Sequence, residues 1–439
     1  MKEIDFTSGT LNKSILKYYF PLLLSNLLQQ LYSFVDMVII GKGLNDNAVA
    51  AVGNFLSLSF FITGFIMGIT NGFAVNISHE YGKKDYQSLK KHIAISIKLC
   101  IYTAIIFTCI GLILLKTTLI LMKTDSNLIS SCLRYGYFIW GGLIVTIFYN
   151  LLSSILRVIG DSRTPLIAVC ISSVANIVLD LLTIFIFNLG VLGPAIATIL
   201  SQFIAVLICY QKLKKTNELN LHKDDFTPNS IIAKGLMKNG IPMALMNSIT
   251  SIGTIYIQSC INHFGINYTA AYSCGNKYLN LFMLPGITLG FTTSAFVGQN
   301  YGAKKFTRIQ EGVKISIIIG GLSVIIAFPF IYALSIQLSK LIVSNPTTID
   351  YSALYLKNLA GVIILLYLLF IYRSAVQSLG KPTAPMISGF AEMLLRIIFI
   401  RVGLNSLGFK SAIYAEGLAW IGALAINYLA YKHYINKKV

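Results

Sequence analysis

The sequence predicts an all-α integral membrane protein with twelve transmembrane helices in two pseudo-symmetric bundles of six. Its composition, its long apolar runs and an internal repeat all predict this fold. Hydrophobic residues make up 55% of the 439 residues and charged residues 12%, whereas soluble domains carry about 25% charged residues. Mean hydropathy is +0.72. The class of soluble globular proteins is therefore excluded.

Twelve apolar runs are long enough to cross a bilayer, which takes roughly 20 residues of helix. The first run is too long for a signal peptide, so we expect no cleaved leader. The predicted spans lie near residues 15–41, 48–76, 92–116, 131–158, 164–188, 191–212, 231–262, 269–297, 311–337, 351–378, 383–405 and 411–433.

The two halves of the chain resemble each other. Short motifs recur at offsets between 218 and 221 residues: Tyr81-Gly82 as Tyr301-Gly302, Gly160 and Pro165 as Gly380 and Pro385, and Pro21 as Pro242. Each half holds six spans, and an even number preserves direction, so the repeats are parallel. Such repeats place the substrate site at their interface. We therefore predict an N-lobe (residues 1–211), a cytoplasmic linker (212–230) and a C-lobe (231–439).

The net charge of +19 is mainly a topology signal. Lys and Arg concentrate in the even-numbered connections and both tails, which places both termini in the cytoplasm by the positive-inside rule. We expect a multi-pass protein of a bacterial-type inner membrane, with the lipid bilayer as its surroundings and a monomer as its state. A nucleic-acid partner is excluded because no basic soluble domain is present.

Cofactor and enzyme chemistry find little support in the sequence. The chain has seven cysteines, an odd number, and none of them form a C-x-x-C motif. This pattern argues against a disulfide framework and against a zinc site. The five histidines fall in loops or near span ends. We see no set of nucleophile and base, and we expect neither an enzyme nor a cofactor other than a coupling ion.

Four acidic residues fall inside spans: Asp36, Asp180, Glu392 and Glu416. Such acids are rare, costly and usually functional. The first two lie in the first half, and the second half has Tyr256 or Ile257 opposite Asp36 and Ile400 opposite Asp180. This asymmetry predicts a coupling site confined to one lobe.

Polar residues around the two aspartates form an oxygen-rich set. Asn176 and Asp180 are four apart on one helical face, and Thr198 lies in the next span. With Asp36, these residues suit a hard cation. Two adjacent buried carboxylates cannot both stay ionised cheaply, so the site can accept H⁺ or Na⁺. For Asn176 and Thr198 alone, ordinary helix–helix hydrogen bonding is an equally good reading.

At this point the residues carry a resemblance to the multidrug and toxic compound extrusion (MATE) family. It rests on the stretch from Pro21 to Gly53, on YGKKD at 81–85 and on GDSRTP at 160–165, and it extends over essentially the whole chain. The resemblance implies cation-driven export of amphipathic, often cationic, drugs and dyes.

One branch of that family, the DinF-like branch, matches the residues already singled out. It implies a proline bend in helix 1 fifteen residues before an Asp, an Asn and an Asp four apart on helix 5, and a Thr on helix 6. Here these are Pro21, Asp36, Asn176, Asp180 and Thr198. The NorM-like branch adds second-half acids near Thr250 and Leu368, which this chain lacks, so a second-lobe cation site is in doubt.

Glu392 and Arg396 are four apart on one helical face, and we predict that they form an internal salt bridge. The competing hypothesis is that Glu392 faces the substrate cavity and attracts cations. Aromatic, thioether and amide side chains suit promiscuous binding. The remaining substrate-cavity candidates are Gln29, Tyr32, Tyr149, Tyr256, Phe282 and Met283.

The predicted mechanism is alternating access, in which the cation and the substrate compete and helix 1 bends at Pro21. An ordinary proline in the first turn is the alternative for Pro21. A flippase or exporter of a lipid-linked or other endogenous metabolite is the alternative function. A lipid-linked substrate would call for a larger basic cavity, and the intramembrane cations do not obviously cluster in the sequence. A channel is a further alternative, which a unitary conductance would support.

Overall fold

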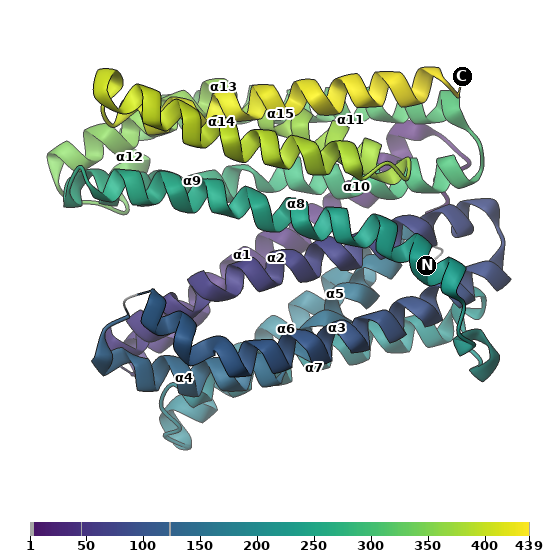
Figure 1. Ribbon diagram of the computed structural model, residues 1–439, viewed down its shortest axis with the longest axis horizontal. Coiled ribbons are helices and arrows are strands. Elements are labelled where there is room, and N and C mark those ends of the chain that lie inside the picture. The colour runs from purple at the N-terminus through teal and green to yellow at the C-terminus, as the bar shows by residue number, and fades with distance from the viewer. Residues whose placement is uncertain (1–3, 45, 123, 439) are drawn as a thin grey trace. The chain divides into compact units, whose positions relative to one another are not determined.

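The computed structural model of the protein describes residues 4–44, 46–122 and 124–438, and these residues form helices and short turns with no strand among them. The predicted all-α membrane fold is confirmed (Figure 1). In the first half the helices are α1 (Leu11–Gly43), α2 (Asp46–Lys83), α3 (Tyr86–Leu121), α4 (Ser126–Gly141), α5 (Leu143–Val158), α6 (Arg163–Leu181) and α7 (Leu192–Lys215). In the second half they are α8 (Ser230–Asn262), α9 (Ile266–Phe282), α10 (Leu284–Gly302), α11 (Phe306–Ala333), α12 (Ser335–Lys340), α13 (Pro346–Ser378), α14 (Thr383–Leu407) and α15 (Lys410–Asn436).

The helices agree with the twelve predicted spans. Among the described residues, eleven helical stretches are long and apolar enough to cross a membrane, and the pair α4 and α5 gives a twelfth if its 47° bend lies within one span. That bend falls at Gly142, where an added Cβ would come within 2.6 Å of the Ile199 side chain. The glycine therefore both breaks the helix and allows α7 to approach closely.

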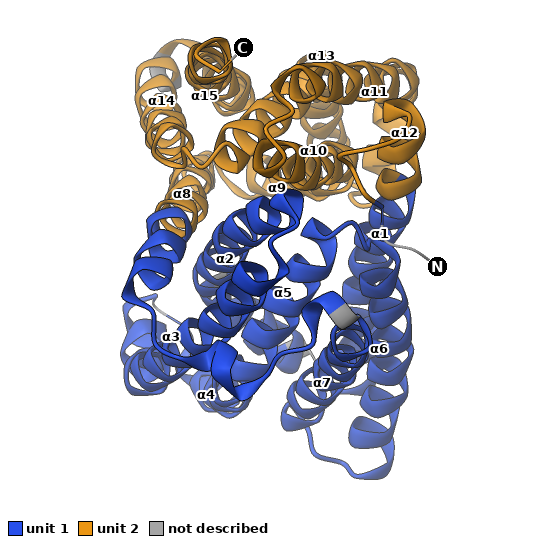
Figure 2. Ribbon diagram, turned by 90° about the vertical axis from the view of Figure 1, so that its right-hand side faces the viewer, with its two compact units in different colours: residues 1–4, 20–241 blue, residues 5–19, 242–439 orange. Residues whose placement is uncertain are grey.

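The chain forms two compact units, coloured separately in Figure 2. Of the described residues, unit 1 contains Ile4 and residues 20–241, and unit 2 contains residues 5–19 and 242–438. These boundaries differ from the predicted 211 and 231. The first part of α1 belongs to unit 2 and the first part of α8 belongs to unit 1, so each helix changes unit next to its proline, Pro21 or Pro242.

Polar contacts explain why the N-terminal segment belongs to unit 2. Phe6 is fully buried against Tyr18 and Phe296. Its backbone N–H donates to Gln299 Oε1 at 2.9 Å, and the Arg308 guanidinium donates to the carbonyl of Phe6, also at 2.9 Å. These bonds satisfy backbone groups that precede the first helix.

Close packing ties the start of α8 to unit 1. A Cβ on Gly72 of α2 would lie 2.5 Å from the Gly240 Cα, so only glycine permits this approach. Asn239 Nδ2 donates to Asn76 Oδ1 at 2.9 Å, and Asn76 Nδ2 donates to the Gly235 carbonyl at 3.1 Å. Small residues and hydrogen bonds from amide side chains between helices commonly hold helices together in lipid.

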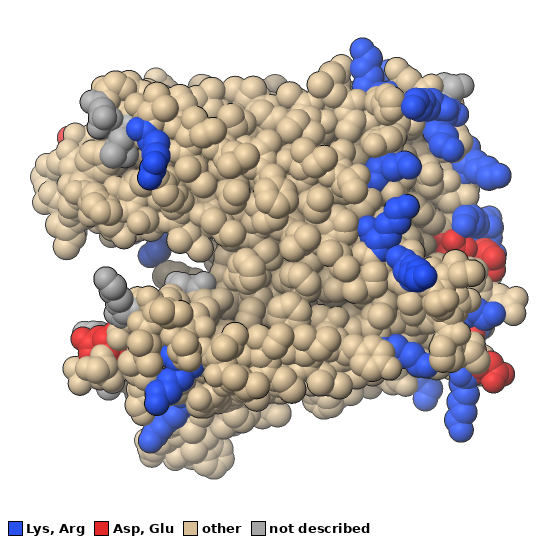
Figure 3. Space-filling model, in the orientation of Figure 1, with Lys and Arg blue, Asp and Glu red and all other residues tan. Residues whose placement is uncertain are grey.

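The connection between the halves is short and ordered into two 3₁₀ turns, Asn217–Leu219 and Lys223–Phe226. Leu219 is fully buried, and Lys98 of α3 donates to the Phe226 carbonyl. The connection thus packs against unit 1. On the face drawn in Figure 3, the Lys and Arg side chains lie toward the two sides of the view, more of them on the right, and few charged side chains lie between them.

Candidate functional site

Three helices of unit 1 carry the four predicted cation-coupling residues. Asp36 comes from α1, Asn176 and Asp180 come from α6, and Thr198 comes from α7. Asn176 and Asp180 are fully buried, whereas Asp36 and Thr198 are half-buried. The helices α6 and α7 pack along each other, which places the α6 acid in the interior of the unit.

The carboxyl groups of Asp36 and Asp180 lie within hydrogen-bonding range of each other. Asp36 Oδ1 and both carboxyl oxygens of Asp180 are buried, and no donor from the residues that the structure describes reaches them. Ionised carboxylates only accept hydrogen bonds. Two of them in contact therefore require a proton on one, or a cation held between them.

Asn176 adds further unpaired polar atoms one turn before Asp180. Its side chain is fully buried, and neither its Oδ1 nor its Nδ2 has a partner. Buried polar groups are almost always hydrogen-bonded, so this amide is exceptional. Its oxygen can serve as a neutral ligand beside the acids, and the reading of Asn176 as an ordinary helix–helix bridge is not supported.

The helix changes its winding directly after Asp180. Residues Leu182–Ile186 form a π-helical turn, and the Thr183 hydroxyl donates to the Asp180 carbonyl at 3.3 Å. Single π-turns inside α-helices occur frequently at functional sites. The turn leaves Asp180 at a locally irregular point of a span, where backbone groups can adjust around an ion.

Tyr135 of α4 completes the site and was missed by the sequence analysis. Its hydroxyl hydrogen-bonds Thr198, and it lies, with Tyr32, in electrostatic range of both acids. Its only signal in the sequence was its repeat partner, Tyr355, at the offset that relates Gly160 to Gly380. Thr198 therefore has a tyrosine partner, while the acids have only each other.

The donor set fits a proton or a hard monovalent cation. Among the described residues no group of three His, Cys, Asp or Glu side chains converges, as a zinc site would need. Two carboxyls and one unpaired amide oxygen in a buried position are hard oxygen ligands, and their orphaned atoms need a proton or a cation. If Na⁺ is the coupling ion, Asp36, Asn176, Asp180 and Thr198 are the residues that would hold it.

Pro21 lies in the interior of α1, not in its first turn as the alternative reading held. The pyrrolidine removes one intrahelical hydrogen bond there. Pro21 is about 22 Å from Asp36 along the helix, at 1.5 Å per residue. It stands where α1 passes from unit 2 to unit 1.

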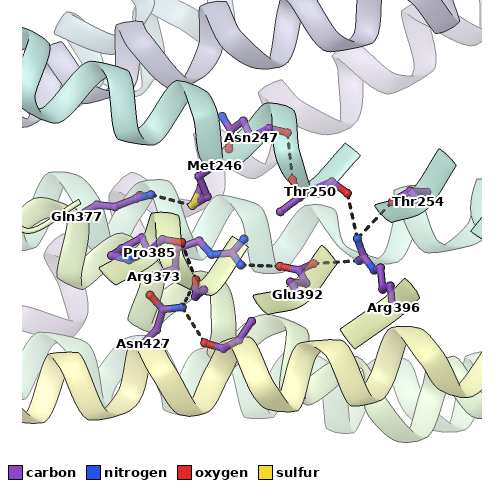
Figure 4. Close-up of polar contacts among 12 residues, drawn as sticks. Met246, Asn247, Thr250, Thr254, Arg373, Gln377, Pro385, Glu392, Arg396 and Asn427 are labelled. Atoms are coloured by element: carbon purple, nitrogen blue, oxygen red, sulfur yellow. Dashed lines mark hydrogen bonds and ion pairs between the residues drawn. The ribbon is translucent and has the colours of Figure 1, made fainter. Parts of the chain in front are cut away.

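In unit 2 the predicted ion pair is confirmed, and it has a third member. Arg396 Nη2 lies 2.9 Å from Glu392 Oε1, and Arg373 of α13 donates to Glu392 Oε2 at 2.7 Å (Figure 4). Sequence spacing does not reveal that Arg373 and Arg396 cluster, because the two residues come from different helices. Both oxygens of Glu392 are taken by guanidinium groups, which counts against its role as a free attractor of cations.

The remaining substrate-cavity candidates are dispersed and partly exposed. In unit 1, Gln29 and Tyr149 lie on α1 and α5. In unit 2, Tyr256 accepts a hydrogen bond from Arg401 Nε at 3.0 Å, and Phe282 stacks on Tyr278. Met283 stands at the break between α9 and α10. Of the candidates in unit 1, Tyr32 is the one that the structure brings to the acids.

Comparisons with known proteins agree with this architecture. The family model MatE matches residues 21–182 and 242–402, so the two matched segments start at Pro21 and Pro242. The chain is 30% identical over 349 residues to the probable multidrug resistance protein YoeA of Bacillus subtilis, covering 77% of this chain and 74% of that one. It is 26% identical to the probable multidrug resistance protein YpnP of Bacillus subtilis, over 99% and 97% of the two chains.

A crystal structure described as MATE in the bent conformation superimposes with a TM-score of 0.93 at 21% sequence identity, covering 100% of this chain and 98% of that one. At this identity the likeness shows the fold. The family match is broader evidence, because it covers both repeats and most of the chain. The chain therefore belongs to the MatE family, whose members are transporters and not enzymes.

Proposed function

We propose that the protein is a cation-coupled multidrug efflux antiporter that exports amphipathic, often cationic, compounds by alternating access. The relatives named as multidrug resistance proteins support the substrate class. The observation that supports the coupling is the pair of carboxyl groups of Asp36 and Asp180, which lie within hydrogen-bonding range of each other. Asp36 Oδ1 and both oxygens of Asp180 are buried and have no donor among the described residues.

The geometry suits an exchange between an inorganic cation and an organic substrate. An unpaired buried carboxylate pair is costly, so the pair favours whichever conformation supplies a proton or Na⁺. Loading the site removes that cost and changes the packing of α1 against α6. Coupling requires that the cation bind the two conformations with different affinities, since equal affinity would shift nothing.

Pro21 supplies the mechanical link in this proposal. Because its ring removes a hydrogen bond in the middle of α1, the helix can bend there at lower cost than elsewhere. The bend stands next to the point at which α1 changes from one compact unit to the other. A cation bound near Asp36 therefore acts through the helix and not by contact with the proline.

The oxygen ligands of the site suit both H⁺ and Na⁺ as the coupling ion. The match of Asp36, Asn176, Asp180 and Thr198 supports a place in the DinF-like branch. We further propose a monomer in a bacterial-type inner membrane with both termini cytoplasmic, on the basis of the Lys and Arg distribution.

Dye efflux in inverted membrane vesicles, driven separately by a pH gradient and by a Na⁺ gradient, tests the proposal. Wild-type protein should move dye with at least one gradient, and Asp36→Asn should abolish movement with either. The matched control is Asp85→Asn, because Asp85 is an exposed N-cap of α3 and asparagine caps as well as aspartate. Unchanged efflux in Asp36→Asn at equal membrane levels would refute the coupling role.

A further inference from the structure

The polar cluster of unit 2 stands in the same place in the second repeat as the acid site does in the first. Gly160 recurs as Gly380, an offset of 220 residues. At this offset Asn176 of α6 is equivalent to Arg396 of α14, and Asp180 is equivalent to Ile400. Pro21 recurs as Pro242, which sets Asp36 opposite Ile257. Ile257 and Ile400 are both fully buried. The second repeat therefore has isoleucines at the positions of both acids and a guanidinium at the position of the amide.

Neighbouring positions are adapted to that guanidinium. Gly253 of α8 is the repeat equivalent of Tyr32. A Cβ on Gly253 would lie 3.1 Å from Arg396 Cδ. The missing side chain makes room for the arginine. Arg396 Nη1 donates to the Thr250 carbonyl at 3.2 Å and contacts Thr254 Oγ1 at 3.3 Å. The guanidinium is held between α8 and α14, as Figure 4 shows.

Donors exceed acceptors in this cluster. Glu392 accepts from Arg373 and Arg396 through its two oxygens. Leu189-Gly190 recurs as Leu407-Gly408, which makes Glu416 the equivalent of Thr198. Glu416 accepts hydrogen bonds from the hydroxyls of Tyr272 and Tyr355, each at 2.9 Å. The Nε atoms of Arg373 and Arg396 are buried and have no partner. Buried charged donors of this kind are rarely left unpaired.

We propose that Arg373 and Arg396 form a binding site for the carboxylate of an amphipathic substrate, with polarity opposite to that of the cation site in unit 1. The proposal rests on the efflux function above and names a substrate class for it: compounds that carry a carboxylate, zwitterions included. Arginine recognises carboxylates with its planar fork of donors. The two side chains remain 10% and 9% exposed, although their unpaired Nε atoms are buried.

The charge of the cluster favours one carboxylate over a pyrophosphate. Glu392 already neutralises one of the two guanidinium groups, and Glu416 lies in electrostatic range of Arg396. At most one uncompensated positive charge remains. A pyrophosphate brings two or more negative charges and would be under-compensated there, which a low-polarity environment penalises.

Equilibrium binding to the full-length protein in lipid nanodiscs tests this inference, with an N-dansyl amino acid and its methyl ester as matched probes. The ester keeps the size and the aromatic group and lacks the charge. We expect Arg396→Lys to weaken binding of the acid at least about tenfold and to change binding of the ester less than about twofold. Lysine keeps the ion pair with Glu392, so the fold is preserved.

Three controls decide the outcome. Arg401→Lys, an exposed arginine on the same helix, should leave both probes unchanged. Sodium acetate should displace the acid better than sodium chloride at equal ionic strength; equal displacement would show a site for any small anion and overturn the carboxylate assignment. Equal weakening of acid and ester in Arg396→Lys would also overturn it.

The binding measurement is independent of transport. If Asp36→Asn abolishes efflux while acid and ester bind alike to the wild type, the substrate inference fails and the antiport proposal stands. If acid binding depends on Arg396 while no ion gradient drives efflux, the antiport proposal fails and the binding site stands.

Discussion

The helices α6 and α14 occupy equivalent positions in the two repeats, yet they carry opposite chemistry. On α6, Asn176 and Asp180 present buried acceptors without donors. On α14, Arg396 stands opposite Asn176 and shares Glu392 with Arg373, leaving buried donors without acceptors. The same helical scaffold thus carries the proposed cation site in one repeat and the proposed carboxylate site in the other. The parallel repeats determine where each site forms, and a few side chains determine whether it favours a positive or a negative ligand.

The tyrosines show how closely the scaffold is kept. Tyr135 of α4 hydrogen-bonds Thr198 of α7, and its counterpart Tyr355 of α13 hydrogen-bonds Glu416 of α15 at 2.9 Å. The aromatic partner is retained while the residue it holds changes from a hydroxyl to a carboxyl. Exchanging these side chains between the repeats tests whether each site depends on the residues named here.

The largest effect is expected for Asp180→Ile, which copies Ile400 into the first repeat. Cation-driven efflux should be lost. Thermal stability should rise, because a buried carboxyl without a donor is replaced by an apolar side chain. Vesicle efflux and the melting temperature of the purified protein measure the two effects. Loss of both function and stability would show that the acid is structural.

Glu392→Gln should be the most destabilising change in the second repeat. It removes the carboxylate between Arg373 and Arg396 and leaves two buried guanidinium groups uncompensated, at a cost of about 3–5 kcal/mol. Chemical denaturation of the purified protein measures this cost. Glu311→Gln, an exposed glutamate of α11, is the control and should change stability little. Equal stability of the two variants would mean that the buried charge network is not formed.

A smaller loss is expected for Gly253→Ala. The new Cβ would lie 3.1 Å from Arg396 Cδ and 3.3 Å from the Met393 backbone, so the arginine or the helix must shift, at about 1–3 kcal/mol. Gly321→Ala in α11, where no atom lies within 4 Å, should be neutral or gain up to about 1 kcal/mol from helix propensity. If both alanines behave alike in denaturation, the room for Arg396 has no structural role.

The smallest expected effect is a difference in stability between variants of the two equivalent tyrosines, Tyr135 and Tyr355. Tyr355→Phe removes one of two donors to the buried carboxyl of Glu416, and Tyr135→Phe removes a bond to a hydroxyl. The Glu416 side chain is buried, whereas Thr198 is half-buried, and an acceptor left unsatisfied in the interior costs more than one that is partly exposed. We therefore expect Tyr355→Phe to cost about 1 kcal/mol more than Tyr135→Phe by denaturation. The reverse order would mean that the bond between Tyr355 and Glu416 contributes no more than the bond between Tyr135 and Thr198.

The sequence was sufficient for the spans, and it singled out Asp36 and Asp180, which the structure brings close together. Asn176 and Asp180 share a helical face by simple spacing, and an acid in an apolar run is conspicuous, so both signals are local. Arg373 was missed because its partner lies on another helix, and nothing in the spacing along one helix reveals that. Tyr135 was hidden among many aromatic residues and could have been found through Tyr355.

The boundaries of the compact units could not be predicted for a similar reason. The longest hydrophilic connection suggested a division near 211–231, but compactness follows packing and not polarity. Gly72 against Gly240 holds the start of α8 in unit 1, and Phe6 against Phe296 holds the N-terminal segment in unit 2. Such contacts join residues far apart in the chain, which the sequence does not mark.

The most direct test of the central claim is the release of a bound cationic dye from purified protein on addition of H⁺ or Na⁺. The account predicts release in the wild type and in Arg396→Lys, and no release in Asp180→Asn, because the carboxyl pair is what the cation occupies. Release that persists undiminished in Asp180→Asn would contradict the account.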